Sequence, residues 1–145
     1  MKVLMQRVSQ ARVEVEGQIV GNIDRGLLLL IGIEAHDDEA LVARMAQRVV
    51  GYRVFADEAG KMNLDVRDVG GELLAVSQFT LAADTRKGRR PGFSGAAEPG
   101  KGRELYEYCV QCLQAQGVGV KTGIFAADMQ VALVNDGPVT FLLEL

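Results

Sequence analysis

A proline directly after an Asp-Gly pair near the C-terminus constrains the fold of this chain more than any other feature. The residues are Asn135-Asp136-Gly137-Pro138-Val139-Thr140, set between the apolar runs 129–134 and 139–145. Asp-Gly between alternating apolar segments is typical of a β-hairpin. The proline, however, cannot donate to a central ladder and restricts the glycine before it. The sequence therefore predicts two strands joined by an irregular turn, and it leaves open whether the Gly-Pro bond is cis or trans.

The composition predicts one globular domain over residues 1–145. Hydrophobic residues make up 48% of the 145 positions and charged residues 24%, which is ordinary for a domain with one sizeable core. The polar residues among the first twelve positions exclude the apolar region of a signal peptide, and the apolar run 27–31 is too short to span a bilayer. We therefore expect a cytoplasmic protein that does not enter a membrane.

Strand patterns outnumber helix patterns along the chain. Strands are predicted over 2–8, 11–15, 18–23, 27–33, 73–79, 118–125, 129–134 and 139–145, with short extended pieces at 52–55 and 62–64. Helices are predicted from Asp37-Asp38 to Gly51 and over 103–116, with a long loop over 82–102 between the second helix and the strand before it. The continuous apolar run 27–33 predicts a central strand. The fold class is therefore α+β: a curved, mostly antiparallel sheet or barrel with two packed helices.

Residues of conventional catalytic and metal sites are scarce. The single histidine, His36, stands beside Asp37-Asp38 at a helix start, where a surface or capping role fits better than that of a general base. Glu34 adds an acid nearby, but the cluster lacks the spacing and glycine of a calcium loop, so we assign no metal. Gly100-Lys101-Gly102 lacks the strand-loop-helix context of a nucleotide-binding loop.

Two cysteines, Cys109 and Cys112, form a C-x-x-C pair. Redox pairs of this kind lie at a helix N-terminus, where the thiolate is stabilised, but these two fall inside a helical pattern. Zinc would need further ligands, which the neighbouring sequence does not offer. The pattern indicates packing within a helix.

The net charge of -3 argues against indiscriminate binding of nucleic acid. One loop is nevertheless basic, with four cations in five residues: Arg86, Lys87, Arg89 and Arg90. A few well-placed cations suffice for contact with phosphates, although such a run also fits a solvated loop.

A second polar feature ends the predicted strand 73–79, which turns polar at Ser77-Gln78. Ser-Gln-Phe-Thr-Leu at 77–81 and Asn-Asp-Gly-Pro-Val-Thr at 135–140 together resemble the two signature motifs of the D-aminoacyl-tRNA deacylases. Residues 1–9, 26–32 and 87–93 also resemble that family, so the resemblance spans essentially the whole chain. It departs at Ala126, where the family more often has glycine.

The resemblance implies a cofactor-free enzyme that proofreads tRNA. Its reaction would be hydrolysis of the ester in D-aminoacyl-tRNA, and in glycine mischarged on the tRNA for alanine. Family members are homodimers with the active site at the interface, where a Gly-Pro bond, cis in the family, reaches into the partner's pocket. Gly137 and Pro138 would thus present backbone carbonyls that exclude an L side chain and leave room for a D residue or glycine.

The same resemblance implies roles for the remaining site residues. The implied reaction centre comprises Ser77, Gln78, Phe79 and Thr80, with the amides of Phe79 and Thr80 as oxyanion donors. Thr80 has no visible base to activate it, so the ribose 2′-hydroxyl is the alternative that family chemistry suggests for assisting the attack of water. The implied binding residues are Met129 in an adenosine pocket, Arg7 holding the turn, and Arg86, Lys87, Arg89 and Arg90 on acceptor-stem phosphates.

Two other interpretations remain open. A non-catalytic tRNA-binding module would use the basic loop and show salt-sensitive binding without ester cleavage. A dimeric scaffold without a pocket would make poor use of a polar strand end and an irregular turn. The sequence leaves open the preferred amino acid and tRNA set, the choice between Thr80 and the ribose, and the contacts across a dimer.

Overall fold

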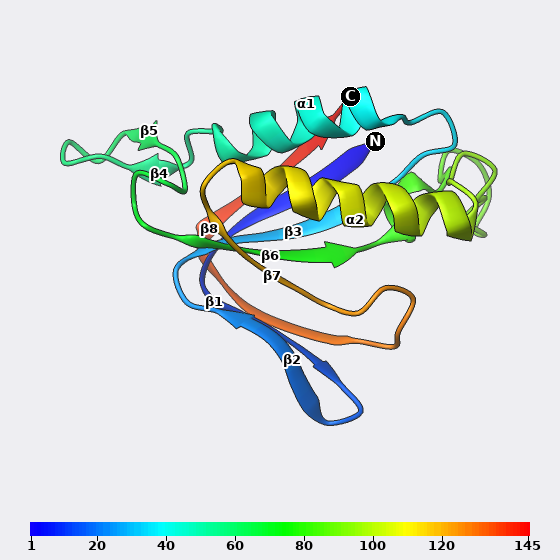
Figure 1. The fold of residues 1–145 in the computed structure, drawn as a ribbon, viewed down its shortest axis with the longest axis horizontal. Coiled ribbons are helices and arrows are strands. Elements are labelled where there is room, and N and C mark those ends of the chain that lie inside the picture. Colours follow the sequence, from blue (N-terminus) through cyan, green and yellow to red (C-terminus); the bar gives the residue numbers. More distant parts are fainter.

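The computed structural model describes residues 1–145 and contains a strongly curled sheet with two helices packed on one face (Figure 1). The sheet comprises β1 (Lys2–Val15), β2 (Gln18–Ile23), β3 (Gly26–Gly32), β6 (Glu72–Ser77), β7 (Gly119–Thr122) and β8 (Gln130–Glu144). A separate ribbon consists of β4 (Phe55–Ala56) and β5 (Met62–Leu64). The helices are α1 (Glu39–Val50), α2 (Pro99–Ala115) and the short 3-10 helix η1 (Phe79–Ala82).

Strand β1 has the most partners in the sheet, because it pairs antiparallel with β2, β3 and β8. The main path runs β2-β1-β3-β6-β7, which confirms residues 27–33 as the central strand and confirms the α+β class with a curved sheet. Two of the pairings, β3 with β6 and β6 with β7, are parallel. Each is parallel because a helix-containing connection brings the chain back to the end of the sheet at which the preceding strand began.

The sheet curls until its ends, β2 and β7, approach each other. Gly21 in β2 makes this approach close: a Cβ atom there would lie 2.5 Å from the carbonyl oxygen of Thr122 in β7. Only a residue without a side chain fits at that position. The result is a nearly closed, barrel-like sheet.

The alternation of apolar residues in β3 supplies two separate layers of core. Leu27, Leu29 and Ile31 face α1 and α2 in the main cluster, whereas Leu28 belongs to a smaller cluster on the opposite, concave face. The continuous apolar run of this strand is therefore explained by cover on both faces, as the sequence predicts.

The hairpin predicted around Gly137-Pro138 is wrong. Residues 129–134 and 139–145 do not pair with each other, and β8 runs through as one strand along β1. Asn135 pairs with Val8 and Thr140 with Gln6, so the residues between them bulge out opposite Arg7 alone. The chain bulges rather than reverses because the fourteen-residue β1 offers both apolar flanks one continuous partner.

Other element boundaries differ by a few residues. Helix α1 begins after Asp38, whose carboxylate accepts a hydrogen bond from the Leu41 amide at 2.9 Å, as predicted for an N-cap. Helix α2 begins at Pro99 rather than at 103, because proline is pre-organised for the first helical turn. The strand predicted over 73–79 ends at Ser77, where η1 begins. Neither α1 nor α2 is long and apolar enough to cross a bilayer.

Candidate active site

The polar end of β6 forms the first part of the candidate site. The Gln78 amide continues the ladder by donating to the Ile31 carbonyl at 2.8 Å, after which the chain tightens into η1. Ser77 and Gln78 are half-buried, while Phe79 and Thr80 are exposed. The four predicted reaction-centre residues therefore lie together where a buried strand meets the surface.

The Thr80 hydroxyl has a donor, not a base, as its neighbour. The Gln78 side-chain amide lies 2.6 Å from Thr80 Oγ1 and donates to it. An amide NH₂ group cannot accept the proton of a hydroxyl. This contact fixes the Thr80 side chain but does not activate it as a nucleophile.

The first turn of η1 offers main-chain donors at the same place. The first N–H groups of such a helix have no acceptor within it, and here they belong to Phe79 and Thr80. No side chain caps this helix end. Adjacent N–H groups on an exposed helix start can stabilise a developing oxyanion.

The Gly137-Pro138 turn forms the second part of the candidate site. Its peptide bond is cis, the isomer that the sequence left open. The Arg7 guanidinium crosses the base of the turn, donating from Nε to the Asp136 carbonyl at 2.9 Å and from Nη1 to the Val54 carbonyl at 2.7 Å. Arg7 therefore contacts the base of the turn, the position predicted for it.

The Asn135 side chain closes the bulge from the other side. Its Oδ1 accepts the Val139 amide at 2.7 Å, and its Nδ2 donates to Thr140 Oγ1 at 3.0 Å. Asn135 and Arg7 thus hold both ends of an exposed segment, Asp136–Pro138. Its carbonyls are presented on a rigid frame rather than on a loose loop.

The two parts of the candidate site lie far apart within one chain. Arg7, opposite the turn, shares a row of the sheet with Leu27 and Leu73. Ser77 lies four residues further along β6, and β8 is separated from β6 by β1 and β3. At about 4.8 Å per strand and 3.3 Å per residue, the separation is roughly 20 Å along the sheet. A single protomer does not bring the turn and the strand end together.

Met129 lies beside the strand end rather than beside the turn. The Gly123 amide donates to the Ala75 carbonyl of β6 at 3.2 Å, and a Cβ on Gly123 would lie 2.6 Å from Met129 Sδ. Met129 also packs on the concave cluster that includes Val76. A predicted adenosine-pocket residue and the predicted reaction centre therefore share one region.

The basic loop is closed at its base and tied to η1. The backbones of Asp84 and Gly92 bond to each other in both directions, at 2.7 and 3.0 Å. Phe93, just beyond, packs against Phe79 with ring centroids 5.3 Å apart. The loop borders a hollow of about 460 Å³ lined by Asp84, Arg86, Lys87, Arg90, Gly92 and Ser94.

One of the four loop cations is already paired. The Arg86 guanidinium donates to both carboxylate oxygens of Asp84, at 2.8 and 2.7 Å, and this contact holds the pKa of the Asp84 carboxyl well below its usual range. Lys87, Arg89 and Arg90 are exposed and make no ion pair. These three cations are therefore the ones free to meet an anion.

A second hollow, of about 140 Å³ between β1, β2 and β8, contains none of the predicted site residues.

Comparison with known proteins places nearly the whole chain within one family. The family model described as D-Tyr-tRNA(Tyr) deacylase matches residues 4–144. The chain belongs to this deacylase family. Two relatives named D-aminoacyl-tRNA deacylase come from Alcanivorax borkumensis, 71% identical with 100% of both chains covered, and from Pectobacterium atrosepticum, 60% identical with 97% of both covered.

Solved structures of similar proteins agree with the deacylase fold. A c-Myc DNA unwinding element binding protein superimposes with a TM-score of 0.95 at 38% identity, covering 100% of this chain and 99% of the other. A structure described as a probable eukaryotic D-amino acid tRNA deacylase gives a TM-score of 0.87 at 16% identity, covering 99% and 98%. The second likeness concerns the fold alone.

Two residues that contribute to the candidate site are not predicted by the sequence. The motif names Asn135 without predicting a role for it, although an asparagine before a turn is a known signal for bonds to nearby backbone groups. The Val54 carbonyl, which holds Arg7, carries no sequence signal because every residue has a carbonyl.

Proposed function

We propose that this chain hydrolyses the ester bond of D-aminoacyl-tRNA, and of glycine mischarged on the tRNA for alanine, releasing free amino acid and tRNA. It would act without a cofactor, as a single domain over residues 1–145, in proofreading in the cytoplasm. Membership of the deacylase family supports this reaction, because relatives that are 71% and 60% identical carry that name.

The observation that most supports a site shared by two chains is a distance. The turn and the strand end lie roughly 20 Å apart in one protomer, counted along the sheet. Two copies of the chain would complete the site, with Gly137-Pro138 of one protomer meeting Ser77–Thr80 of the other. The outer edge of β8 supports such a homodimer because this strand pairs only with β1 and exposes Val134, Phe141 and Leu142. Open, apolar strand edges are usually covered by a partner.

The chemistry of the proposed site is electrostatic rather than nucleophilic. An aminoacyl ester is activated, so its hydrolysis needs a positioned water and a stabilised oxyanion more than a strong nucleophile. The amides of Phe79 and Thr80 would bind the oxyanion, with Ser77 and Gln78 shaping the centre. The terminal ribose 2′-hydroxyl, rather than Thr80, would assist the attack of water, because the neighbour of Thr80 is the Gln78 amide donor.

In this proposal the enzyme selects D-aminoacyl esters by excluding the side chain of an L-amino acid. The backbone carbonyls of Gly137 and Pro138, held by Arg7 and Asn135, would occupy the space on which an L side chain projects. Met129 would border the adenosine, and Arg86, Lys87, Arg89 and Arg90 would approach acceptor-stem phosphates, with Lys87, Arg89 and Arg90 contributing most because Arg86 is paired.

The decisive experiment incubates the purified chain with D-Tyr-tRNA, L-Tyr-tRNA and Gly-tRNA for alanine, and follows release of the amino acid. We expect cleavage of the D and glycyl esters while the L ester survives. Thr80→Ala should retain at least a tenth of the wild-type rate, because loss of a nucleophile usually costs far more. An inactive Thr80→Ala protein with normal fold and tRNA affinity would make that hydroxyl the nucleophile.

The same assay decides between enzyme and binding module. A chain that binds tRNA in a salt-sensitive way but leaves all three esters intact would be a non-catalytic tRNA-binding module, and the proposal would fail.

A further inference from the structure

Two large aromatic side chains lie exposed beside the candidate site, in contact with each other. Phe79 in η1 is 59% exposed, and Phe93, just after the basic loop, is 41% exposed. Their ring centroids are 5.3 Å apart and their planes are tilted by 49°, so each ring covers only part of the other. Phe79 belongs to the proposed reaction centre, whereas the Phe93 ring has no part in the proposed site.

The backbone is fixed on both sides of Phe93. Before it, Asp84 and Gly92 bond to each other in both directions. After it, the Ala96 amide donates to the Phe93 carbonyl at 3.0 Å, which closes a turn. The Phe93 ring is therefore held at the surface by a hydrogen-bonded segment.

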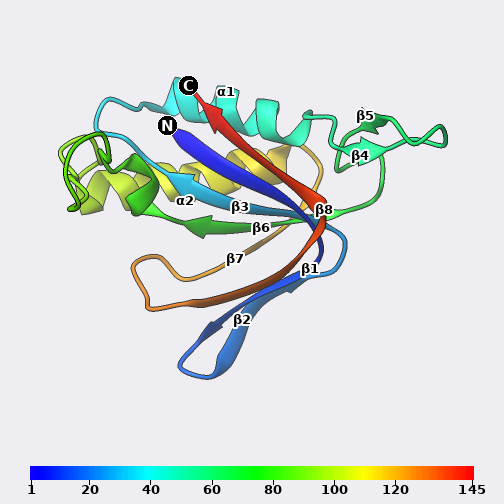
Figure 2. The same cartoon turned by 180° about the vertical axis from the view of Figure 1, so that it is seen from behind.

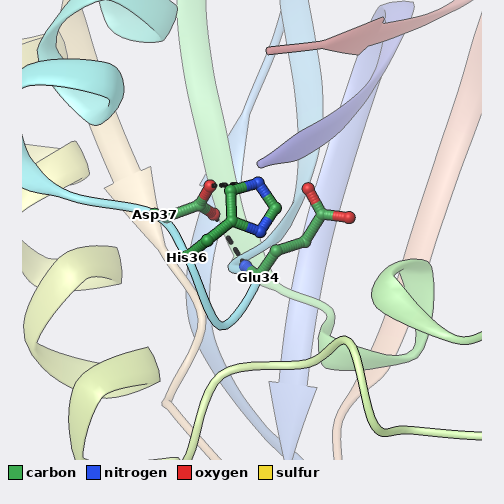
Figure 3. Close-up of side chains that lie close together, drawn as sticks. All are labelled: Glu34, His36 and Asp37. Carbon is green, nitrogen blue, oxygen red and sulfur yellow. Dashed lines mark hydrogen bonds and ion pairs between the residues drawn. The ribbon is translucent and has the colours of Figure 1, made fainter.

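That turn is bonded to the segment between β3 and α1. The Ala35 amide donates to the Gly95 carbonyl at 3.0 Å, and within the same segment the Asp37 carboxylate accepts the Glu34 amide at 2.7 Å. Figure 3 shows this second contact. Strand β3 pairs with β6, whose end carries the reaction centre. Phe93 is therefore attached to the strand next to the reaction centre.

Exposed aromatic rings beside unpaired cations match the chemistry of single-stranded nucleic acid. Cations hold its phosphates, and its bases stack on aromatic rings whatever their identity. The residues on either side of Phe93, which are Gly92 and Ser94, line the hollow of about 460 Å³ together with Lys87 and Arg90. An apolar protein partner would bury these cations without a counter-charge, which is costly. The surface therefore fits a polyanion that carries flat rings.

We propose that the Phe93 ring stacks on a base in the unpaired 3′ end of tRNA, namely the base that precedes the terminal adenosine. This inference rests on the proposed function, which sets the ester at Ser77–Thr80 and the adenosine beside Met129. Phe93 contacts Phe79 of that centre, so it lies where the next nucleotide of the strand would follow. The phosphates of the strand then meet the cations of the basic loop.

Kinetics on two substrates test the role of Phe93. D-Tyr-tRNA contains the base in question, whereas D-tyrosyl-adenosine, the same ester on a single nucleoside, lacks it. In Phe93→Ala we expect the KM for D-Tyr-tRNA to rise about tenfold, the size of one lost base stack, with kcat and the cleavage of D-tyrosyl-adenosine unchanged. Phe93→Tyr keeps an aromatic face and should keep the wild-type KM. Phe93→Leu keeps only apolar bulk and should resemble the alanine variant.

Met62→Ala is the matched control and should keep the wild-type KM. Met62 in β5 is 46% exposed, but the β4–β5 ribbon lies at the opposite end of the molecule from the basic loop (Figures 1 and 2). An unchanged KM in Phe93→Ala would overturn the inference. So would an equal loss on both substrates, because the ring would then act by supporting Phe79. Conversion of a dimer to a monomer in Phe93→Ala, seen by light scattering, would assign the ring to a subunit contact instead.

A binding measurement separates this inference from the proposed reaction. Uncharged tRNA with 2-aminopurine in place of the base before the terminal adenosine reports stacking by its fluorescence, whether or not the ester is cleaved. We expect the wild-type chain to change that fluorescence and Phe93→Ala to lose most of the change. A signal that does not depend on Phe93 would refute the stacking. Intact esters together with a Phe93-dependent signal would refute only the proposed hydrolysis.

Discussion

At the scale of single residues, two backbone positions with a positive φ are occupied by different residue types, one glycine and one alanine. Gly137 has a φ of +144° and Ala126 a φ of 64°. Glycine adopts such angles freely, whereas a Cβ atom is strained there. The first position therefore depends on glycine, whereas the second holds an alanine in a strained conformation.

Gly137→Ala should damage both the turn and its selectivity. The added Cβ would lie 2.7 Å from Val139 Cγ2 and 3.1 Å from Arg7 Nη2. We expect a loss of about 1 to 3 kcal/mol in unfolding free energy and a smaller ratio of D-Tyr-tRNA to L-Tyr-tRNA cleavage. Gly60→Ala is the matched control, since Gly60 also has a positive φ, +79°, but open space around it. An unchanged ratio in Gly137→Ala would remove the turn from chiral selection.

Ala126→Gly should stabilise the protein. Glycine removes the left-handed strain, and its greater freedom in the unfolded chain offsets only part of that gain, so we expect about 0.5 to 1 kcal/mol in denaturant unfolding. Ala127→Gly, at a neighbour without a positive φ, should instead cost a similar amount. A loss in both variants would contradict the strain argument.

At the scale of elements, α2 shows why the C-x-x-C pair is not a redox centre. Cys109 and Cys112 lie inside the helix, in its C-terminal half, away from the N-terminus as predicted, and neither forms a disulfide. Burial, with a smaller contribution from Cys112, raises the pKa of the Cys109 thiol to about 12. The thiolate, which is the reactive form, is therefore rare at this position.

Alkylation of the folded protein should therefore distinguish the two cysteines. At pH 8 a thiol with a pKa of about 12 is ionised in roughly one molecule in ten thousand. We expect iodoacetamide to modify Cys112 more than tenfold faster than Cys109, and Cys109 only after unfolding, as followed by peptide mass analysis. Equal rates, or a disulfide between them after mild oxidation, would contradict this assignment.

The elements also show what the sequence could predict. Periodicity and turn signals located β3, α1 and the hairpin of β1 with β2, because their signals are local. Local signals could not predict that residues 130–144 form one continuous strand instead of a hairpin. That outcome depends on pairing with β1, which lies at the other end of the chain. Likewise the motif predicted Gly137 and Ser77 as site residues, but only the strand order shows that one protomer keeps them apart.

At the scale of the whole molecule, the open edge of β8 is the feature that a dimer would use. Substituting one of its exposed apolar residues should therefore affect assembly and activity together. Leu142→Glu should shift the protein toward the monomer and lower deacylation in proportion to the dimer lost. Light scattering on a sizing column measures the first effect, and release of D-tyrosine the second.

Ile19→Glu is the matched control for this prediction. Ile19 in β2 is 59% exposed, against 48% for Leu142, but β2 is separated from β8 by β1. We expect its assembly and activity to match the wild type. A fully active monomeric Leu142→Glu protein would show that one protomer suffices for catalysis.

The pairing of β1 with β8 has a consequence for synthesis. The two ends of the chain lie side by side when seen from either direction (Figures 1 and 2). During synthesis, therefore, the edge of β1 that pairs with β8 stays exposed until the fifteen residues of β8 have left the ribosome. During that interval β1 is open to pairing with other nascent chains, so early chaperone cover should matter more for this protein than its small size suggests.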